Sequence, residues 1–238
     1  MRADTQDRVI ALTYDDGPHP GHTPAILREL ADRDVRATFF VLTERAEAEP
    51  QLVRSMLAAG HEIALHGIDH ARLTEVFWPR AVARIWRAKR RLEKVTGQRV
   101  SMYRPTYGAQ GLAQFVTARL LGMEVVYWTA WAQDWLDDDA RTVADRAVLA
   151  RHPGAILLLH DTTEDGEAMR EGPLPSFDRA EVTARVVDEL RVDGYELVPA
   201  GELIGRYPLV RSVTTQRPWV GLKRRVGTIL DRATPPAR

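Results

Sequence analysis

The stretch VIALTYDDGP (residues 9–18) sets an apolar run directly before two adjacent carboxylates, Asp15 and Asp16, and a Gly-Pro turn. A short apolar run that ends in turn residues is typical of a buried strand. The same arrangement recurs further along the chain, where residues 63–65 lead into His66 and His70. Acids and imidazoles therefore stand where predicted strands end.

Outward from this stretch, short apolar runs alternate with longer segments whose apolar residues recur every three or four positions. This alternation predicts repeated βα units, and about seven of them favour a distorted (β/α)7-8 TIM-like barrel with parallel strands in a single α/β domain. The predicted strands cover residues 9–14, 37–42, 62–65, 101–104, 124–128, 155–160 and 196–198. The predicted helices cover residues 24–31, 49–59, 79–96, 112–121, 140–150 and 177–192, with Gly60 and Gly97 as C-caps and Asp139 or Ser176 as N-caps.

Composition limits the classes of partner. The 238 residues carry 33 Lys and Arg against 33 Asp and Glu, so no net charge favours nucleic acid, and we expect a neutral or small substrate. The absence of cysteine excludes a thiolate nucleophile and a Cys-ligated zinc. No apolar segment is long enough for a transmembrane helix or a signal peptide, so a native start at Met1 predicts a cytoplasmic protein. The oligomeric state stays open.

The strand ends of a parallel barrel converge on one face, which brings distant residues together. A mononuclear metal site needs about three protein ligands, and a hydrolase built on it needs a carboxylate that stays free to take a proton. One of Asp15 and Asp16 could bind metal while the other acts as base. Alternatively, the acids form a solvated turn, and His66 and His70 are ordinary core and surface residues.

Together, the motifs at the strand ends resemble the polysaccharide deacetylases of carbohydrate esterase family 4 over residues 9–198. The resemblance implies a metal-dependent hydrolase that removes N-acetyl or O-acetyl groups from sugars. It implies Asp15 as general base and Asp16, His66 and His70 as metal ligands. Two imidazoles and one carboxylate suit Zn²⁺, although Co²⁺, Fe²⁺ or Mn²⁺ would also be accepted.

The resemblance also assigns the remaining site residues. Arg104 would pair with the catalytic Asp and keep it ionised, and the backbone N–H of Tyr107 would stabilise the oxyanion. His160 would protonate the leaving amine as general acid. The predicted substrate-binding residues are Pro105, Gly108, Trp131, Trp135 and Leu158. Asp161 stays open between a turn former and a site residue.

The sequence departs from the family pattern at Trp131, where the family usually has an Asp that holds the catalytic histidine. Either Asp134 takes over that role, or His160 titrates at lower pH than in relatives, and we predict the lower titration. Trp131 and Trp135 could be core residues or could stack on a pyranose ring. We favour Trp135 as a groove wall and leave Trp131 open.

The other histidines receive structural or peripheral roles. His19 and His22 lie in a Pro- and Gly-rich stretch and are predicted as loop residues at the rim of the site. His61 and His152 precede their strands and are predicted as structural residues on the far face of the barrel.

The barrel domain is predicted to cover residues 1–204, followed by a basic extension over 205–238. Apolar residues in this extension recur at helical spacing opposite basic ones; they are Trp219, Val220, Leu222, Val226, Ile229 and Leu230. A terminal helix packed on the barrel is favoured, and peripheral contact with an anionic membrane is the alternative.

We expect the substrate to be N-acetylglucosamine units in an oligosaccharide, glycan or glycoconjugate. A second hypothesis is a metal-dependent amidase that acts on a cyclic ureide, an imide or another small amide. A third, suggested by Trp131, is a catalytically impaired carbohydrate-binding module. Retention of the acids, histidines and Arg104 disfavours the third, because binding alone has no need of the full set.

Overall fold

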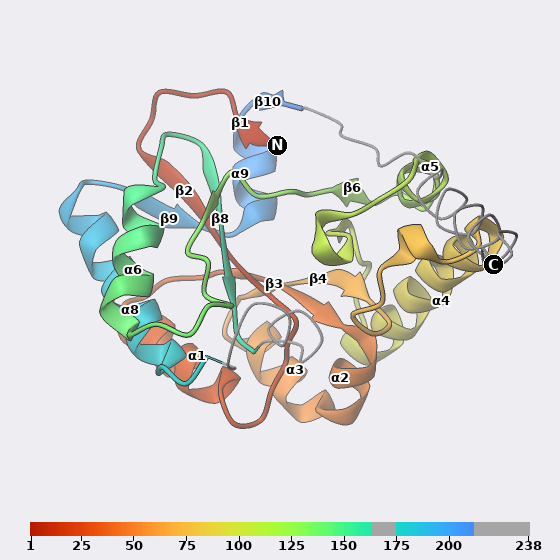
Figure 1. Cartoon of the computed structure of the whole chain (residues 1–238), viewed down its shortest axis with the longest axis horizontal. Helices are drawn as coiled ribbons and strands as arrows, with labels where there is room; N and C mark the ends of the chain where they lie inside the picture. The colour runs from red at the N-terminus through yellow and green to blue at the C-terminus, as the bar shows by residue number, and fades with distance from the viewer. Residues whose placement is uncertain (163–174, 212–238) are drawn as a thin grey trace, which may run out of the picture.

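The computed structural model describes residues 1–162 and 175–211. Figure 1 shows a central group of strands with helices around its outside. The strands are β1 (Arg2–Ala3), β2 (Val9–Asp15), β3 (Thr38–Leu42), β4 (Glu62–Gly67), β5 (Met102–Tyr103), β6 (Glu124–Val125), β7 (Ala130–Trp131), β8 (Ala155–His160), β9 (Glu196–Val198) and β10 (Leu209–Val210).

The helices follow the strands in the order expected of βα units. They are α1 (Thr23–Asp32), α2 (Thr43–Ala48), α3 (Pro50–Ala58), α4 (Trp78–Thr96), α5 (Leu112–Leu120), α6 (Ala140–Leu149), α8 (Arg179–Val192) and α9 (Ala200–Arg206), with 3-10 turns η1 (Leu73–Glu75) and η2 (Thr106–Gly108). Among the described helices, none is both long and apolar enough to cross a membrane.

The main sheet has eight parallel strands in the order β6-β5-β4-β3-β2-β8-β7, with β9 also paired to β2. Within the described ranges no ladder joins β6 to β7, so the sheet curls into a half-barrel rather than a closed ring. β2 lies at the centre of the curl, since it pairs with β3, β8 and β9. The predicted parallel, barrel-like α/β domain is confirmed.

Side chains alternate between the two faces of the strands and so build two cores. On β2, Ile10, Leu12 and Tyr14 belong to the core between the sheet and the helices. Val9 and Ala11 belong to a smaller core inside the curl. Residues that continue this alternation at the C-terminal end of each strand also face the inside of the curl, and the site residues begin there.

Most predicted elements are present, with differences at short ones. The helix α2, the strand β7 and the antiparallel pair of β1 with β10 were not predicted. Gly97 ends α4 in a left-handed conformation (φ 66°), and Asp139 caps α6 by accepting a hydrogen bond from the Thr142 N–H, both as predicted. Ser176 as an N-cap is wrong, because Asp178 accepts from the Ala180 N–H at the start of α8.

The boundary predicted between residues 204 and 205 falls inside α9, which runs to Arg206. Residues up to Val210 pair with β1, and Tyr207 donates a hydrogen bond to Asp7. The predicted basic helix after Trp219 lies outside the described residues, so it remains a prediction together with its membrane contact.

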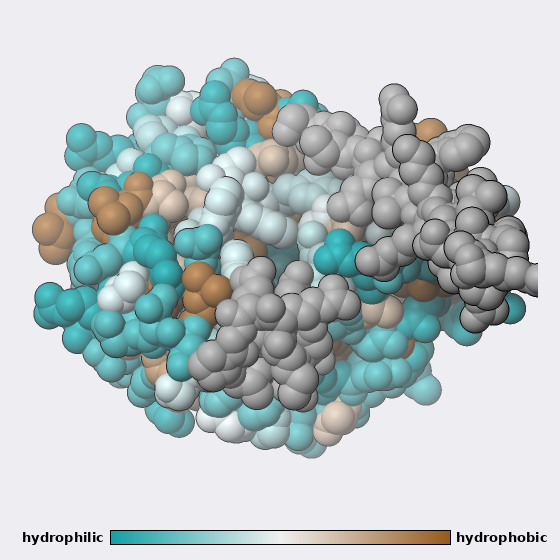
Figure 2. All heavy atoms as spheres, viewed as in Figure 1, coloured by the Kyte–Doolittle hydropathy of each residue, from teal (hydrophilic) through white to brown (hydrophobic). Residues whose placement is uncertain are grey.

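The described surface on the face drawn in Figure 2 is largely hydrophilic, and its hydrophobic residues form separate groups. Individual apolar side chains are nonetheless well exposed, such as Leu149 at the end of α6 and Val192 at the end of α8. Isolated exposed apolar residues are normal for a folded domain.

Candidate active site

The pairing of strands assembles the site. Asp15 on β2 and His160 on β8 are direct partners in the parallel register. Arg104 follows β5, and its N–H bonds the Leu65 carbonyl of β4, beside His66. The side chains of these residues and of His66 lie on the inward face of their strands. They therefore lie close together at one edge of the curled sheet, as predicted.

Asp15 is held by a buried guanidinium. Its Oδ1 lies 2.6 Å from Arg104 Nη1, and both residues are almost fully buried. Arg104 also donates to Thr13 Oγ1 at 2.9 Å and to the Val126 carbonyl at 3.2 Å, while Thr13 donates to the Leu157 carbonyl. These bonds fix the Asp15 carboxylate in one orientation, and they place Thr13, which was not predicted, in the site.

Asp16 turns away from its neighbour toward the two histidines. Its backbone has φ 78°, a left-handed conformation that Asp tolerates better than most residues, and the Gly17-Pro18 bond that follows is cis. Asp16 Oδ1 lies 3.3 Å from His66 Nε2 and 3.3 Å from His70 Nε2. The adjacent acids therefore point at different partners, as the division into base and ligand requires.

Asp16, His66 and His70 could hold a metal ion. One donor atom from each residue lies within 4.8 Å of the other two. Asp16 Oδ1 is buried and has no hydrogen-bond partner among the described residues, and a metal ion would supply one. His66 Nδ1 lies 2.8 Å from the Arg104 carbonyl, so Nδ1 carries the proton and Nε2 is left to bind metal. The donor set fits a divalent ion of the zinc type.

Charge and burial shift the pKa values of Asp16, His66 and His70 by different amounts and in different directions. Burial would raise the pKa of Asp16, but the two imidazoles 3.3 Å away, first His66 and then His70, outweigh it and hold that pKa below its ordinary value. Burial lowers the pKa of His70 to about 4, so its imidazole is neutral at pH 7. Burial also opposes charge on His66, but Asp15 and Asp16 raise its pKa overall. A proton therefore competes with metal mainly at His66.

His160 is paired with Asp134, which corrects the prediction that it titrates at lower pH. Asp134 Oδ1 lies 2.8 Å from His160 Nδ1, and Asp134 Oδ2 accepts the His160 backbone N–H at 2.7 Å. Burial alone would lower the pKa of His160, but the Asp134 charge and hydrogen bond raise it to about 9. The alternative in which Asp134 takes over the role missing at Trp131 is the one the structure shows.

Arg179 at the start of α8 completes this pair. Its Nη1 lies 3.3 Å from Asp134 Oδ2 and 3.0 Å from the His160 carbonyl. Burial would raise the pKa of Asp134, but the charge and hydrogen bond of His160, and after them the charge of Arg179, hold it below its ordinary value. Arg179 was not predicted from the sequence, because it lies at the start of a helix and not at the end of a strand.

The turn after β5 carries the predicted oxyanion donor. Pro105 precedes η2, in which Tyr107 has φ 59° and Gly108 has φ 60°. A Cβ on Gly108 would lie 2.8 Å from the Trp128 ring, so this position has no room for a side chain. The Tyr107 ring lies 4.3 Å from the His70 ring, between centroids, and Arg72 stacks on it.

The predicted substrate-binding side chains differ in position. Trp135 meets the His160 ring edge to face, with 5.9 Å between the ring centroids, so an indole lies beside the predicted general acid. Trp131 on β7 is 44% exposed. Leu158 is opposite Trp131 in the β7–β8 register and is buried. Contact of these residues with substrate, as of Pro105 and Gly108, remains a prediction.

Asp161 is a buried residue beside the turn at Gly17. Thr23 Oγ1 donates to its Oδ2 at 2.5 Å, and the carboxylate packs against Gly17. Burial raises its pKa to about 7. His19 and His22 stack on each other with ring centroids 4.5 Å apart in the loop before α1.

The two histidines predicted as structural lie at strand starts. His61 is buried before β4 and accepts the Ala37 N–H, and burial lowers its pKa to about 4. His152 contacts the Pro153 carbonyl before β8. Neither contacts the residues assembled at the other end of the sheet.

The family model described as polysaccharide deacetylase matches residues 2–126. A peptidoglycan-N-acetylglucosamine deacetylase of Bacillus cereus is 31% identical over 201 residues, which cover 83% of this chain and 89% of that protein. A chitooligosaccharide deacetylase of Bradyrhizobium is 30% identical over 198 residues, covering 82% of this chain and 90% of that protein. The chain belongs to the polysaccharide deacetylase family.

Some relatives are much longer. The peptidoglycan-N-acetylmuramic acid deacetylase PdaC of Bacillus subtilis is 31% identical over 84% of this chain, but the match spans 39% of that protein. The solved PdaC structure superposes with a TM-score of 0.71 at 28% identity, covering 96% of this chain and 98% of that one. A pseudoenzyme of the same family from Bacillus anthracis has a TM-score of 0.73 at 22% identity, covering 85% and 67%, which supports the fold alone.

Proposed function

We propose that the chain is a metal-dependent deacetylase that removes acetyl groups, foremost N-acetyl groups of N-acetylglucosamine units, from an oligosaccharide, glycan or glycoconjugate. One observation carries the proposal: a three-donor group of Asp16, His66 and His70 adjoins a separately held carboxylate, Asp15, with a histidine on the next strand. A metal-dependent amide hydrolase needs a metal site, a base and an acid within reach of one carbonyl carbon.

Asp16, His66 and His70 would hold the ion, for which we propose Zn²⁺. When bound, such an ion polarises a carbonyl and makes a water molecule acidic near neutral pH. Co²⁺, Fe²⁺ or Mn²⁺ would suit the same donors. Removal of metal by a chelator should abolish acetate release, and added Zn²⁺ should restore it.

The protein groups then divide the proton transfers. Asp15, oriented by Arg104 and Thr13, takes the proton of the attacking water. The Tyr107 N–H donates to the oxygen that gains negative charge. His160 is protonated at neutral pH because its pKa is raised to about 9, and it gives its proton to the departing nitrogen.

The substrate class follows from the relatives and from the aromatic wall. The relatives above carry names that specify peptidoglycan N-acetylglucosamine, peptidoglycan N-acetylmuramic acid and chitooligosaccharide. N-acetylated hexosamines are common to these names, and we propose them for this chain. Trp135 at His160 offers a face on which a pyranose can pack.

Two rival functions receive less support. The relatives' names do not favour an amidase for cyclic ureides or imides. A carbohydrate-binding module without activity is the other rival, and the Bacillus anthracis structure named a pseudoenzyme shows that this fold occurs without activity. The buried Asp15–Arg104 and His160–Asp134 pairs favour an enzyme, since a binding role does not need oriented proton-transfer groups.

Asp15→Asn tests the proposal. Loss of the base should lower kcat on N-acetylated chitooligosaccharides by about 10²–10⁴-fold, while Zn²⁺ affinity stays within a few fold because Asp16 and the histidines remain. Acetate release and metal titration measure the two effects. The exposed Asp4→Asn is the matched control and should leave both unchanged. A wild-type protein that binds Zn²⁺ but releases no acetate from any acetylated sugar would contradict the function.

A further inference from the structure

The two histidine ligands are anchored to very different degrees. His66 lies within β4, and its Nδ1 is bonded to the Arg104 carbonyl. His70 lies beyond the strand, and its buried Nδ1 has no hydrogen-bond partner. A ligating imidazole normally bonds an outer partner through its other nitrogen. The orientation of His70 therefore depends on how its backbone is held.

The loop that carries His70, residues 68–73, is held by side chains of three other elements. The Asp69 carboxylate accepts the Ala71 N–H at 3.2 Å and pairs with Arg84 Nη2 of α4. Thr106 in η2 donates to the Ala71 carbonyl at 2.7 Å. Gln114 in α5 donates to the Leu73 carbonyl at 3.0 Å. Every one of these bonds meets the loop next to or after His70.

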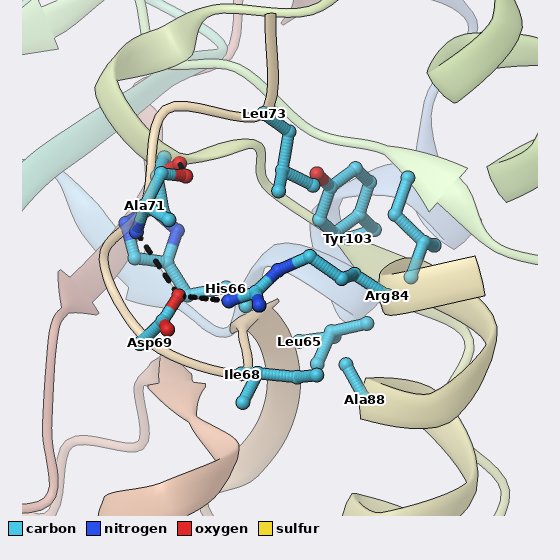
Figure 3. A pocket seen from close by; sticks show the side chains of 12 residues that line it. Leu65, His66, Ile68, Asp69, Ala71, Leu73, Arg84, Ala88 and Tyr103 are labelled. Atoms are coloured by element: carbon cyan, nitrogen blue, oxygen red, sulfur yellow. Dashed lines mark hydrogen bonds and ion pairs between the residues drawn. The ribbon is translucent and has the colours of Figure 1, made fainter. Parts of the chain in front are cut away.

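The ion pair of Asp69 and Arg84 stands apart from the donor atoms of the metal site. Figure 3 shows the Asp69 carboxylate between Ala71 and the Arg84 guanidinium, joined to both by dashed lines. Arg84 lines a small pocket together with the loop residues Ile68 and Ala71. Asp69, one residue before a ligand, is thereby kept on the α4 side of the loop.

We propose that Asp69 and Arg84 are a positioning pair that fixes the 68–73 loop so that His70 Nε2 faces Asp16. The pair acts through His70 on metal affinity and takes no part in proton transfer. This inference rests on the metal site of the proposed function but not on which substrate is turned over. It is specific to this ion pair, since exposed arginines of the same helix do not reach the loop.

Metal affinity tests the pair without any assay of catalysis. Competition between the apo protein and a chelator for Zn²⁺ gives the Kd for the wild type, Arg84→Met and Asp69→Asn. Loss of an outer partner of a metal site typically weakens binding by about 10–100-fold, and we expect this range for Arg84→Met. Met keeps much of the aliphatic stem, so the loop loses its ion pair with little loss of packing. Arg84→Lys should recover most of the affinity.

The matched control is Arg87→Met, which removes the same charge from an exposed position of α4. It should leave the Kd within about twofold, because screened surface charges act weakly at a distance. The double variant Arg84→Met/Asp69→Asn should bind no more weakly than the worse single variant, since residues of one pair are not additive. The absorption bands of bound Co²⁺ should change in Arg84→Met and not in Arg87→Met.

The outcomes separate the two proposals. A Kd of Arg84→Met equal to that of Arg87→Met, with unchanged Co²⁺ bands, overturns the positioning role. A Kd that rises only in step with a lower melting temperature of the apo protein also overturns it, because a general loss of stability then explains the effect. If Arg84→Met binds Zn²⁺ more weakly than the wild type, the positioning role is supported. If the wild type binds Zn²⁺ but releases no acetate, the deacetylase proposal is overturned and the positioning role is not.

Discussion

At the scale of single residues, the His160–Asp134 pair sets how the site responds to pH. A general acid must be protonated, and a pKa of about 9 keeps His160 protonated across the neutral range. Activity that depends on this proton is present below that pKa and is lost as pH rises through it. Trp131 has no part in this pair, because Asp134 makes both contacts with His160.

Asp134→Asn should therefore move the alkaline limb of kcat/KM to lower pH. The variant removes the charge that raises the pKa of His160, while burial, which lowers it, remains. Removal of a neighbouring opposite charge shifts a pKa by about 1–3 pH units. A pH profile of kcat/KM for acetate release measures the limb.

The control for this shift is Asp137→Asn, an exposed acid of the same segment. It should leave the profile in place, because its carboxylate bonds Ser176 rather than His160. An unchanged alkaline limb in Asp134→Asn would show that another group controls it.

The residues of the site differ in how far the sequence predicts them. Asp15, His66, Arg104 and His160 were predictable, because each stands at the end of an apolar run. Thr13 carried a usable signal, since it lies two residues before Asp15 and so on the same face of the strand. No pattern in the sequence indicated Arg179, because its position near the site depends on how α8 packs on the sheet.

At the scale of elements, the turn η2 leaves little room for a substitution at Gly108. Gly108 has φ 60° and no room for a Cβ beside Trp128, whereas Gly97 has φ 66° and open space around it. The two glycines share a left-handed backbone and differ in packing. They offer a matched pair of substitutions.

Gly108→Ala should lower both stability and kcat. Alanine in a left-handed conformation costs about 1–2 kcal/mol, and at Gly108 the contact with Trp128 adds to this by displacing η2 and the Tyr107 N–H. Gly97→Ala should cost only the conformational part and leave kcat unchanged. Urea unfolding and acetate release measure the two effects, and equal losses in both variants would contradict a packing role for Gly108.

Elements were predictable in proportion to their length. α4 and β8 carry long periodic patterns and were found close to their observed bounds. β7 has two residues and α2 has six, too few for a period to emerge. The pairing of β1 with β10 joins the two ends of the described chain, which no local pattern records.

At the scale of the whole molecule, strand order is what the sequence left open. Alternating strands and helices predict a parallel sheet, but the position of β9 beside β2, and the opening between β6 and β7, depend on tertiary packing. Whatever the order of the strands, the carboxyl ends of parallel strands lie at the same edge of the sheet. The site could therefore be predicted without knowledge of the strand order. This is why the site was more predictable than the topology.

Removal of residues 212–238 should leave kcat/KM on short oligosaccharides within about twofold, because the assembled site and the β1–β10 pair remain. Acetate release and a melting curve measure this, and sedimentation with anionic liposomes measures the membrane contact proposed for the extension. Deletion from residue 207 is the comparison: it also removes β10 and the Tyr207–Asp7 bond, so it should melt at lower temperature. Loss of activity in the shorter deletion would contradict a separate extension.

The central place of β2 has a consequence for synthesis on the ribosome. Asp15 and His160 are register partners although 145 residues (160 − 15) separate them, and β9 joins β2 later still. At about 5–20 residues per second, β2 waits on the order of 10 s for β8 to emerge. During this time β3 can pair with one edge of β2, but the edge that β8 will cover stays unpaired, and an unpaired edge of an apolar strand favours aggregation. Asp15 and His160, the proposed base and acid, thus meet only after the chain has been made as far as residue 160.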